Sequence, residues 1–140
     1  MAGTMQAQVK WVEGMRFAGN AGSGHGVSFE SIACDGHVSP SPMELFLIGI
    51  LGCTAIDIVS ILGRMREPLA GLELAANASR AAENPKRFTA IEFVYTLRGK
   101  GLSREKAERA VALSHGTYCS ALASLREDCA ISSRIEIVDD

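Results

Sequence analysis

The N-terminal part of the chain alternates apolar and polar residues in a pattern typical of half-buried strands. The clearest alternation runs over Met5–Trp11, and shorter segments at Met15–Phe17 and Val27–Ile32 predict two further strands. Between the last two, Ala18–Gly26 contains four glycines and is predicted to be a loop. Its GSGHG run lacks the strand–loop–helix frame of a phosphate-binding loop, so we assign it no nucleotide chemistry.

The pattern then changes to that of a long helix. Ser41 can cap it, Pro42 suits its first position, and Glu44 completes an S-x-x-E capping box. We expect the helix to end before Pro68.

This helix is apolar on all sides rather than along one stripe, so other elements or a partner chain must enclose it. Gly49 and Gly52 in its interior each cost about 1 kcal/mol relative to alanine. We therefore expect another backbone to approach closely at these two glycines.

The C-terminal half predicts a hairpin, two helices and a strand. Residues 72–78 and 91–97 alternate around the turn Glu83–Lys86. Ser103 caps an amphipathic helix that Gly116 ends, a second helix is predicted over Thr117–Glu127, and the last strand covers Ile131–Ile137. The order βββαββααβ predicts an α+β fold, and we interpret residues 1–140 as one domain.

Charge and hydrophobic length argue against nucleic acid and membrane partners. Net charge is -2 with no basic stripe, so nucleic acid is not an expected partner. The charge-free stretch Leu45–Ile56 has 12 residues, fewer than the roughly 20 that span a bilayer. With no apolar segment of signal-peptide length at Met1–Lys10, we expect a soluble cytoplasmic protein.

The four cysteines are the candidate reactive groups, although buried cysteines often serve only as small core residues. They are Cys34, Cys53, Cys119 and Cys129, and none forms a C-x-x-C pair. His25 and His37 lie in predicted loops without ligand spacing, so no metal site and no cofactor is expected.

Local physics distinguishes two of these thiols. Cys119 would lie at the second position of a helix capped by Thr117, where the helix N-terminus lowers a thiol pKa. Cys53 lies inside the apolar helix, one turn before Asp57, and burial there would raise its pKa. We interpret Cys119 as the better thiolate, and Cys34 and Cys129 as incidental thiols.

The segment S-P-M-E-L-F-L-I-G-I-L-G-C at Ser41–Cys53, followed by Y-C-S at Tyr118–Ser120, resembles the OsmC/Ohr family and its YhfA-like branch. The resemblance extends to K-W-V-E-G at Lys10–Gly14 and to the order of elements. It implies an OsmC-like fold: antiparallel sheets and a long central buried helix in an intertwined homodimer.

The resemblance also implies a reaction. Cys53 would attack organic or lipid hydroperoxides, and Cys119 would resolve the sulfenic acid as a disulfide. An arginine and a glutamate would activate Cys53, with Arg16 and Glu44 as the counterparts in this chain. A dithiol or lipoylated partner would reduce the protein again.

This chain departs from the family pattern around both cysteines. The family glutamate stands ten residues before the first cysteine, where this chain has Met43, and Glu44 follows. The C-P-x-S motif at the second cysteine is replaced by Cys119–Leu122. We therefore keep two hypotheses: a thiol-dependent hydroperoxide reductase (a peroxidase), and a non-catalytic dimeric module that binds a small apolar or acyl ligand.

Overall fold

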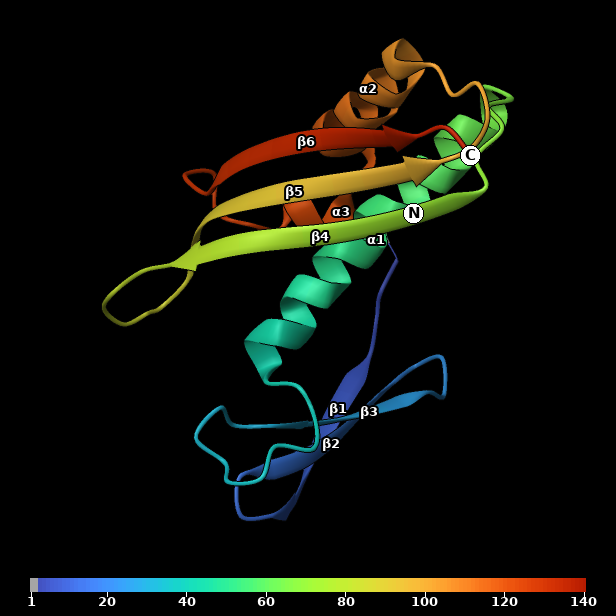
Figure 1. Ribbon diagram of the computed structural model, residues 1–140. Helices are drawn as coiled ribbons and strands as arrows, with labels where there is room; N and C mark the ends of the chain where they lie inside the picture. The colour runs from blue at the N-terminus through green and yellow to red at the C-terminus, as the bar shows by residue number, and fades with distance from the viewer. Residues whose placement is uncertain (1–2) are drawn as a thin grey trace. The chain divides into compact units, whose positions relative to one another are not determined.

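The computed structural model describes residues 3–140, which fall into two compact units. The first unit ends at Ile48 and the second comprises Gly49–Asp140. The predicted order of strands and helices is confirmed, with a π-helical turn added (Figure 1). The elements are β1 (Ala7–Glu13), β2 (Arg16–Ala21), β3 (Gly26–Glu30), α1 (Pro42–Arg64), β4 (Gly71–Arg80), β5 (Phe88–Arg98), α2 (Arg104–Leu113), η1 (Ser114–Tyr118), α3 (Ser120–Ala123) and β6 (Ala130–Val138).

The first unit contains a three-stranded antiparallel sheet in the order β1-β2-β3. The second strand is longer than the sequence pattern indicated, because Gly19 and Asn20 pair with both neighbouring strands. The predicted glycine loop therefore shrinks to the turn between β2 and β3. Phe17 and Phe29, paired across β2 and β3, stack with ring centroids 5.7 Å apart.

The second unit contains the sheet β4-β5-β6. The predicted hairpin of β4 and β5 is confirmed, whereas β6 pairs with β5 in parallel. This parallel pairing is reached through the crossover that α2, η1 and α3 form, as parallel strands require. Alternate residues of β5 make the core of the unit: Ile91, Phe93, Tyr95 and Leu97, each at most 1% exposed.

The central helix α1 begins with the predicted capping box. The Ser41 amide donates to Glu44 Oε1 at 2.9 Å, and the Glu44 amide donates to Ser41 Oγ at 3.2 Å. Within the second unit, α1 buries one face through Ile50, Thr54, Ile58, Ile61 and Leu62. These positions recur every three or four residues, which is the spacing of one helical face.

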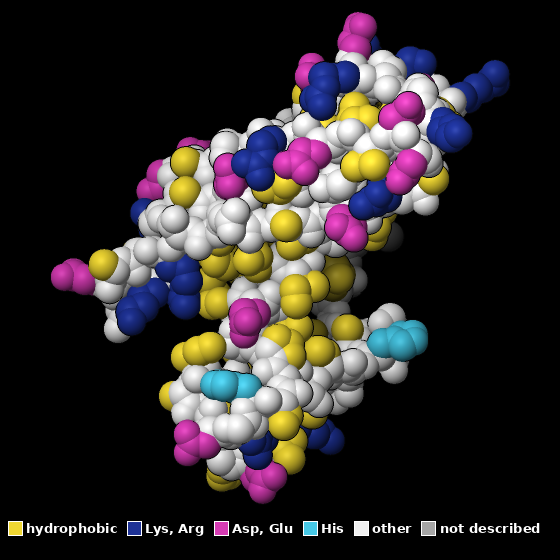
Figure 2. Space-filling view, in the orientation of Figure 1, with side chains coloured by type: hydrophobic (Ala, Val, Ile, Leu, Met, Phe, Trp, Pro, Cys, Tyr) yellow, Lys and Arg dark blue, Asp and Glu magenta, His cyan; other side chains and the backbone are white. Residues whose placement is uncertain are grey.

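The opposite face of α1 leaves large apolar side chains exposed: Ile56 is 72% exposed and Val59 53%. Hydrophobic side chains gather over α1 in the space-filling view, whereas charged side chains crowd the surface around α2 (Figure 2). A Cβ added at Gly49 or Gly52 would meet no atom within 4 Å. The close backbone approach that we expected at these glycines is therefore not made by the described part of this chain.

By length and composition alone, α1 could cross a bilayer, a test that the core helix of a soluble protein also passes. The charge-free stretch is short as predicted, but the helix is 23 residues long and carries Asp57 within it. The buried face of α1 contributes to the core of the second unit.

Candidate functional site

Two of the four thiols lie together in the second unit. Cys53 is on α1 and Cys119 follows η1, and the two side chains are within hydrogen-bonding reach of each other. Cys119 is buried, whereas Cys53 is partly exposed. All four cysteines are free thiols. The arrangement places an accessible thiol beside a buried one, 66 positions apart in sequence.

The turn η1 brings Cys119 to this position. The Cys119 amide donates to the Ser114 carbonyl at 2.8 Å, which closes a five-residue π-helical turn. Such turns accommodate one extra residue in a helix and occur frequently at functional sites. The expected helix over Thr117–Glu127 is reduced to the four residues of α3, and Cys119, rather than Thr117, is its N-cap.

The expectation that Cys119 is the better thiolate is wrong. Burial raises the pKa of the Cys119 thiol to about 11, and the neighbouring Cys53 thiol raises it further. The amide of Leu122 donates to Cys119 Sγ at 3.4 Å and opposes this increase, but a single turn of helix does not compensate for burial. Cys119 is therefore a protonated thiol at neutral pH.

A polar contact joins η1 to α1 one turn beyond Cys53. Ser114, fully buried at the start of η1, donates from Oγ to Asp57 Oδ2 at 2.8 Å. This contact supplies the partner that the Asp57 carboxylate inside α1 needs.

A second polar contact joins β5 to η1. The Tyr95 hydroxyl hydrogen bonds to His115 Nε2, and the Thr54 hydroxyl on α1 is also within reach of Tyr95. Burial raises the pKa of Tyr95 and lowers that of His115, so both are neutral at pH 7. Tyr95 reads from the sequence as a core strand residue and His115 as a helix-end histidine, because their pairing depends on the non-local packing of η1 against β5.

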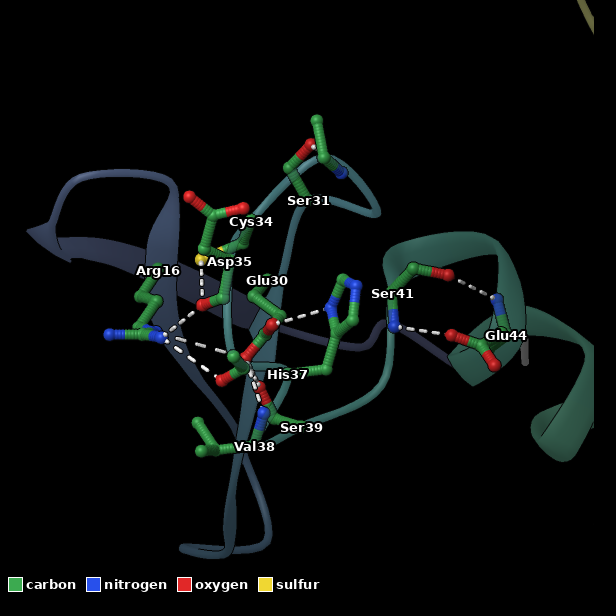
Figure 3. A network of polar contacts seen from close by, with 12 residues as sticks. Arg16, Glu30, Ser31, Cys34, Asp35, His37, Val38, Ser39, Ser41 and Glu44 are labelled. Carbon is green, nitrogen blue, oxygen red and sulfur yellow. Dashed lines mark hydrogen bonds and ion pairs between the residues drawn. The ribbon is translucent and has the colours of Figure 1, made fainter.

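Arg16 lies in the first unit, where it joins a buried carboxylate (Figure 3). Glu30, 1% exposed, accepts from the Val38 amide at 3.1 Å and from Ser39 Oγ at 3.0 Å. It also contacts His37 Nδ1 at 2.9 Å, and Arg16 Nε lies 3.8 Å from its Oε1. These hydrogen bonds, led by that of the Val38 amide, lower the pKa of Glu30.

Glu30, His37, Val38, Ser39 and Arg16 are called the Glu30 cluster below. Two further contacts fix the Arg16 guanidinium. Its terminal nitrogen donates to the carbonyls of Asp35 and Gly36 at 3.0 and 3.3 Å, so the arginine is tied to the loop after β3 (Figure 3). Glu30 is a site residue that the sequence analysis did not single out. In the sequence, Glu30 stands at a polar position near the end of a predicted strand, and nothing there indicates that it is buried.

Glu44 is engaged in the helix cap, as its capping-box position predicted (Figure 3). Hydrogen bonds from the Ser41 amide and hydroxyl lower the pKa of this carboxyl, so it is ionised at neutral pH. The contributions of Arg16 and Glu44 to the chemistry of Cys53 stay predictions.

The other two cysteines contact different residues. Cys34 is in the loop after β3, with its Sγ 3.8 Å from the Asp35 carbonyl. Cys129 is buried directly before β6, and burial raises its pKa. Over residues 3–140, no three His, Cys, Asp or Glu side chains are grouped so that they could hold a metal ion.

Residues 35–134 match the family model described as OsmC-like protein. The chain is 39% identical to Protein YhfA of Escherichia coli over 134 residues, 96% of this chain and 98% of the relative. A solved structure described as structural genomics is 37% identical with a TM-score of 0.87, covering 97% of this chain and all of the other.

An organic hydroperoxide resistance protein from Legionella pneumophila has the same fold at 17% identity, with a TM-score of 0.72 over 97% of this chain and 98% of the other. The matched segment contains both α1 and the turn that carries Cys119. Together with the near full-length relationship to YhfA, this match shows that the chain belongs to the OsmC-like protein family.

Proposed function

We propose that this protein is a thiol-dependent peroxidase that reduces organic or lipid hydroperoxides through Cys53 and Cys119. The observation that carries the proposal is the pairing of an accessible thiol with a buried one within hydrogen-bonding reach. Two neighbouring thiols can lose two electrons by forming a disulfide, and a reductant can then restore both thiols.

The reaction balances over both thiols. The Cys53 thiolate attacks the outer peroxide oxygen, the O–O bond breaks, and the alkoxide takes up a proton to leave as an alcohol. The sulfenic acid on Cys53 is then attacked by Cys119, an S–S bond forms, and water leaves. A dithiol, such as a lipoyl group, reduces the disulfide and is itself oxidised to a disulfide.

Activation of Cys53 requires a cation or a hydrogen-bond donor, since the thiolate is the form that attacks a peroxide. We propose Arg16 as that cation and Glu44 as the carboxylate that assists it. Glu30 supports this assignment, because it already holds the guanidinium by charge.

We further propose that the protein works as a cytoplasmic homodimer. The exposed apolar face of α1 supports this, since Ile56 and Val59 would leave water on association. The open space beside Gly49 and Gly52 would admit the backbone of a second helix.

The test uses reduced protein and one equivalent of cumene hydroperoxide, with free thiols counted and sites identified by peptide mass spectrometry. We expect wild type to lose two thiols and to form a Cys53–Cys119 disulfide. Cys53→Ser should abolish peroxide consumption, and Cys119→Ser should accumulate sulfenic or higher acids on Cys53. Cys34→Ser and Cys129→Ser are the matched controls and should behave as wild type. Retention of both thiols in wild type would contradict the proposal.

Met43 at the position of the family glutamate favours a second function, a dimeric module that binds a small apolar or acyl ligand without catalysis. Native mass spectrometry of gently purified protein distinguishes the two. A retained ligand without peroxide turnover would support the binding module, whereas turnover by ligand-free protein would exclude it.

A further inference from the structure

We propose that the hydrogen bond between Asp57 and Ser114 holds Cys119 beside Cys53 and thereby favours their disulfide over the two free thiols. This inference deepens the proposed function and rests on it, because it concerns the same pair of thiols. Neither Asp57 nor Ser114 takes part in the reaction, so both are positioning residues.

The Asp57–Ser114 bond lies close to the thiol pair along both segments that it joins. On α1, Asp57 comes four residues after Cys53, so the two side chains share a helical face about 6 Å apart along the axis. On the other segment, Ser114 begins η1, and its carbonyl accepts from the Cys119 amide at 2.8 Å. Ser114 therefore contacts α1 through its side chain and Cys119 through its backbone.

The geometry of this bond suits a fixed contact. Ser114 Oγ donates to Asp57 Oδ2 at 2.8 Å, the usual length for a bond between a hydroxyl and an oxygen acceptor. A bond to a carboxylate is stronger than one between two neutral groups. Ser114 is also 0% exposed, so water does not compete for its hydroxyl.

Cys119 needs such an anchor, because regular helix geometry does not fix its position. It follows the π-helical turn and precedes the four residues of α3, and its own backbone is extended at φ -74° and ψ 102°. His115 ties η1 to β5, whereas the Asp57–Ser114 bond ties it to the helix that carries Cys53. A disulfide forms only when the two Cα atoms lie within about 7 Å of each other, so a segment free to move against α1 would seldom meet this condition.

The hydrogen bond and the disulfide restrain the same two segments, and this couples them. A disulfide would keep Ser114 within reach of Asp57, and the hydrogen bond keeps the two thiols at a high effective concentration. Such coupling is reciprocal, so loss of the hydrogen bond should make the disulfide easier to reduce. A bond that only stabilises the fold would contribute equally in both redox states and would leave the reduction potential unchanged.

The experiment measures the reduction potential of the Cys53–Cys119 pair in a Cys34→Ser/Cys129→Ser background of the full chain. The protein is equilibrated at pH 7 with reduced and oxidised dithiothreitol in varied ratios. As the S–S bond forms, the two protein thiols lose two electrons and two protons to the cyclic disulfide of dithiothreitol. Acid quenching, alkylation and mass spectrometry then give the oxidised fraction at each ratio.

We expect Asp57→Ala and Ser114→Ala each to lower the equilibrium constant for disulfide formation roughly tenfold, which raises the potential by about 30 mV. The double variant should show the shift of one change rather than the sum, because each change removes the same bond. Asp57→Asn keeps an oxygen that can accept from Ser114, and should restore most of the background potential.

Ser124→Ala is the matched control. Ser124 comes five residues after Cys119, as Ser114 comes five before it, and its hydroxyl donates to the Ser120 carbonyl at 2.9 Å rather than to α1. This variant should keep the background potential.

Background potentials in Asp57→Ala and Ser114→Ala would overturn the proposal, even if thermal melts show lower stability, because the bond would then support the fold alone. Lower potentials would also overturn it, since the bond would then hold the thiols apart. The full shift in Asp57→Asn would overturn it too, because the charge rather than the bond would set the potential. If Ser114→Ala does not fold, the two Asp57 variants still decide.

The result is independent of hydroperoxide turnover, because no peroxide is used. A protein that does not consume hydroperoxide but shows these shifts would contradict the proposed function alone. Unchanged potentials in variants of a protein that does consume hydroperoxide would overturn this inference alone.

Discussion

At the scale of single residues, the chain contains two buried polar systems that the sequence pattern conceals. One is the set of contacts around the thiol pair, and the other is the Glu30 cluster of the first unit. A buried carboxylate is tolerated only when donors and cations satisfy it, and Glu30 has an amide, a hydroxyl, an imidazole and a guanidinium around it. Its ionised form is therefore part of the folded structure.

Replacing this carboxylate should destabilise the first unit in a pH-dependent manner. In Glu30→Gln, the amide oxygen can still accept from Val38 and Ser39, but the negative charge beside Arg16 is lost, and we expect the melting temperature to fall by several degrees at pH 7. Because folding lowers the pKa of Glu30, its contribution is fully present above the ordinary value of 4.5 and is lost as the pH falls through the lowered pKa.

Melting curves of wild type and Glu30→Gln should therefore converge as the pH falls below 4.5 and through the lowered pKa of Glu30. Glu13→Gln, an exposed glutamate on β1, is the matched control and should change little at any pH. A constant difference between Glu30→Gln and wild type across this range would show that the charge of Glu30 contributes nothing.

At the scale of elements, the sequence pattern predicted the features that depend on residues close together in the chain and missed those that depend on distant packing. The capping box of α1 and the turn between β4 and β5 depend on residues a few positions apart, and both were predicted. The parallel pairing of β6 with β5 and the π-helical turn at Ser114 depend on distant packing, and neither was. For the same reason, local helix electrostatics misjudged Cys119, since its burial comes from elements that are remote in sequence.

The N-terminal cap of α1 allows a direct test of how much such local interactions stabilise the protein. Ser41→Ala removes the hydroxyl that accepts from the Glu44 amide, and should cost about 1 kcal/mol of unfolding free energy. Urea denaturation followed by circular dichroism measures the change. Ser132→Ala, on the exposed part of β6, should be neutral. Equal stability of the two variants would contradict a structural role for the cap.

At the scale of the whole molecule, the exposed side of α1 is the feature that a single chain does not explain. An apolar face of this kind on a core helix is expected to be covered in solution. The resemblance to the OsmC/Ohr family implied a homodimer from the sequence. The exposed side chains of α1 and the open space at its glycines support that prediction without testing it.

A charge placed on this face should break the association. Val59→Asp introduces a carboxylate at a position that is 53% exposed in the single chain, so the chain should still fold. Light scattering after gel filtration should give about twice 14.9 kDa for wild type and 14.9 kDa for the variant. Ser132→Asp is the control and should match wild type. A monomeric wild type at micromolar concentration would refute the homodimer.

The π-helical turn has a consequence for how relatives of this chain are compared. An α-helix advances about 100° per residue, and the extra residue of η1 shifts everything after it by that angle. A relative with one residue fewer between its counterparts of Ser114 and Cys119 would carry its second cysteine on another side of the axis. The length of this segment, as much as the cysteine itself, therefore decides which aligned sequences possess the thiol pair.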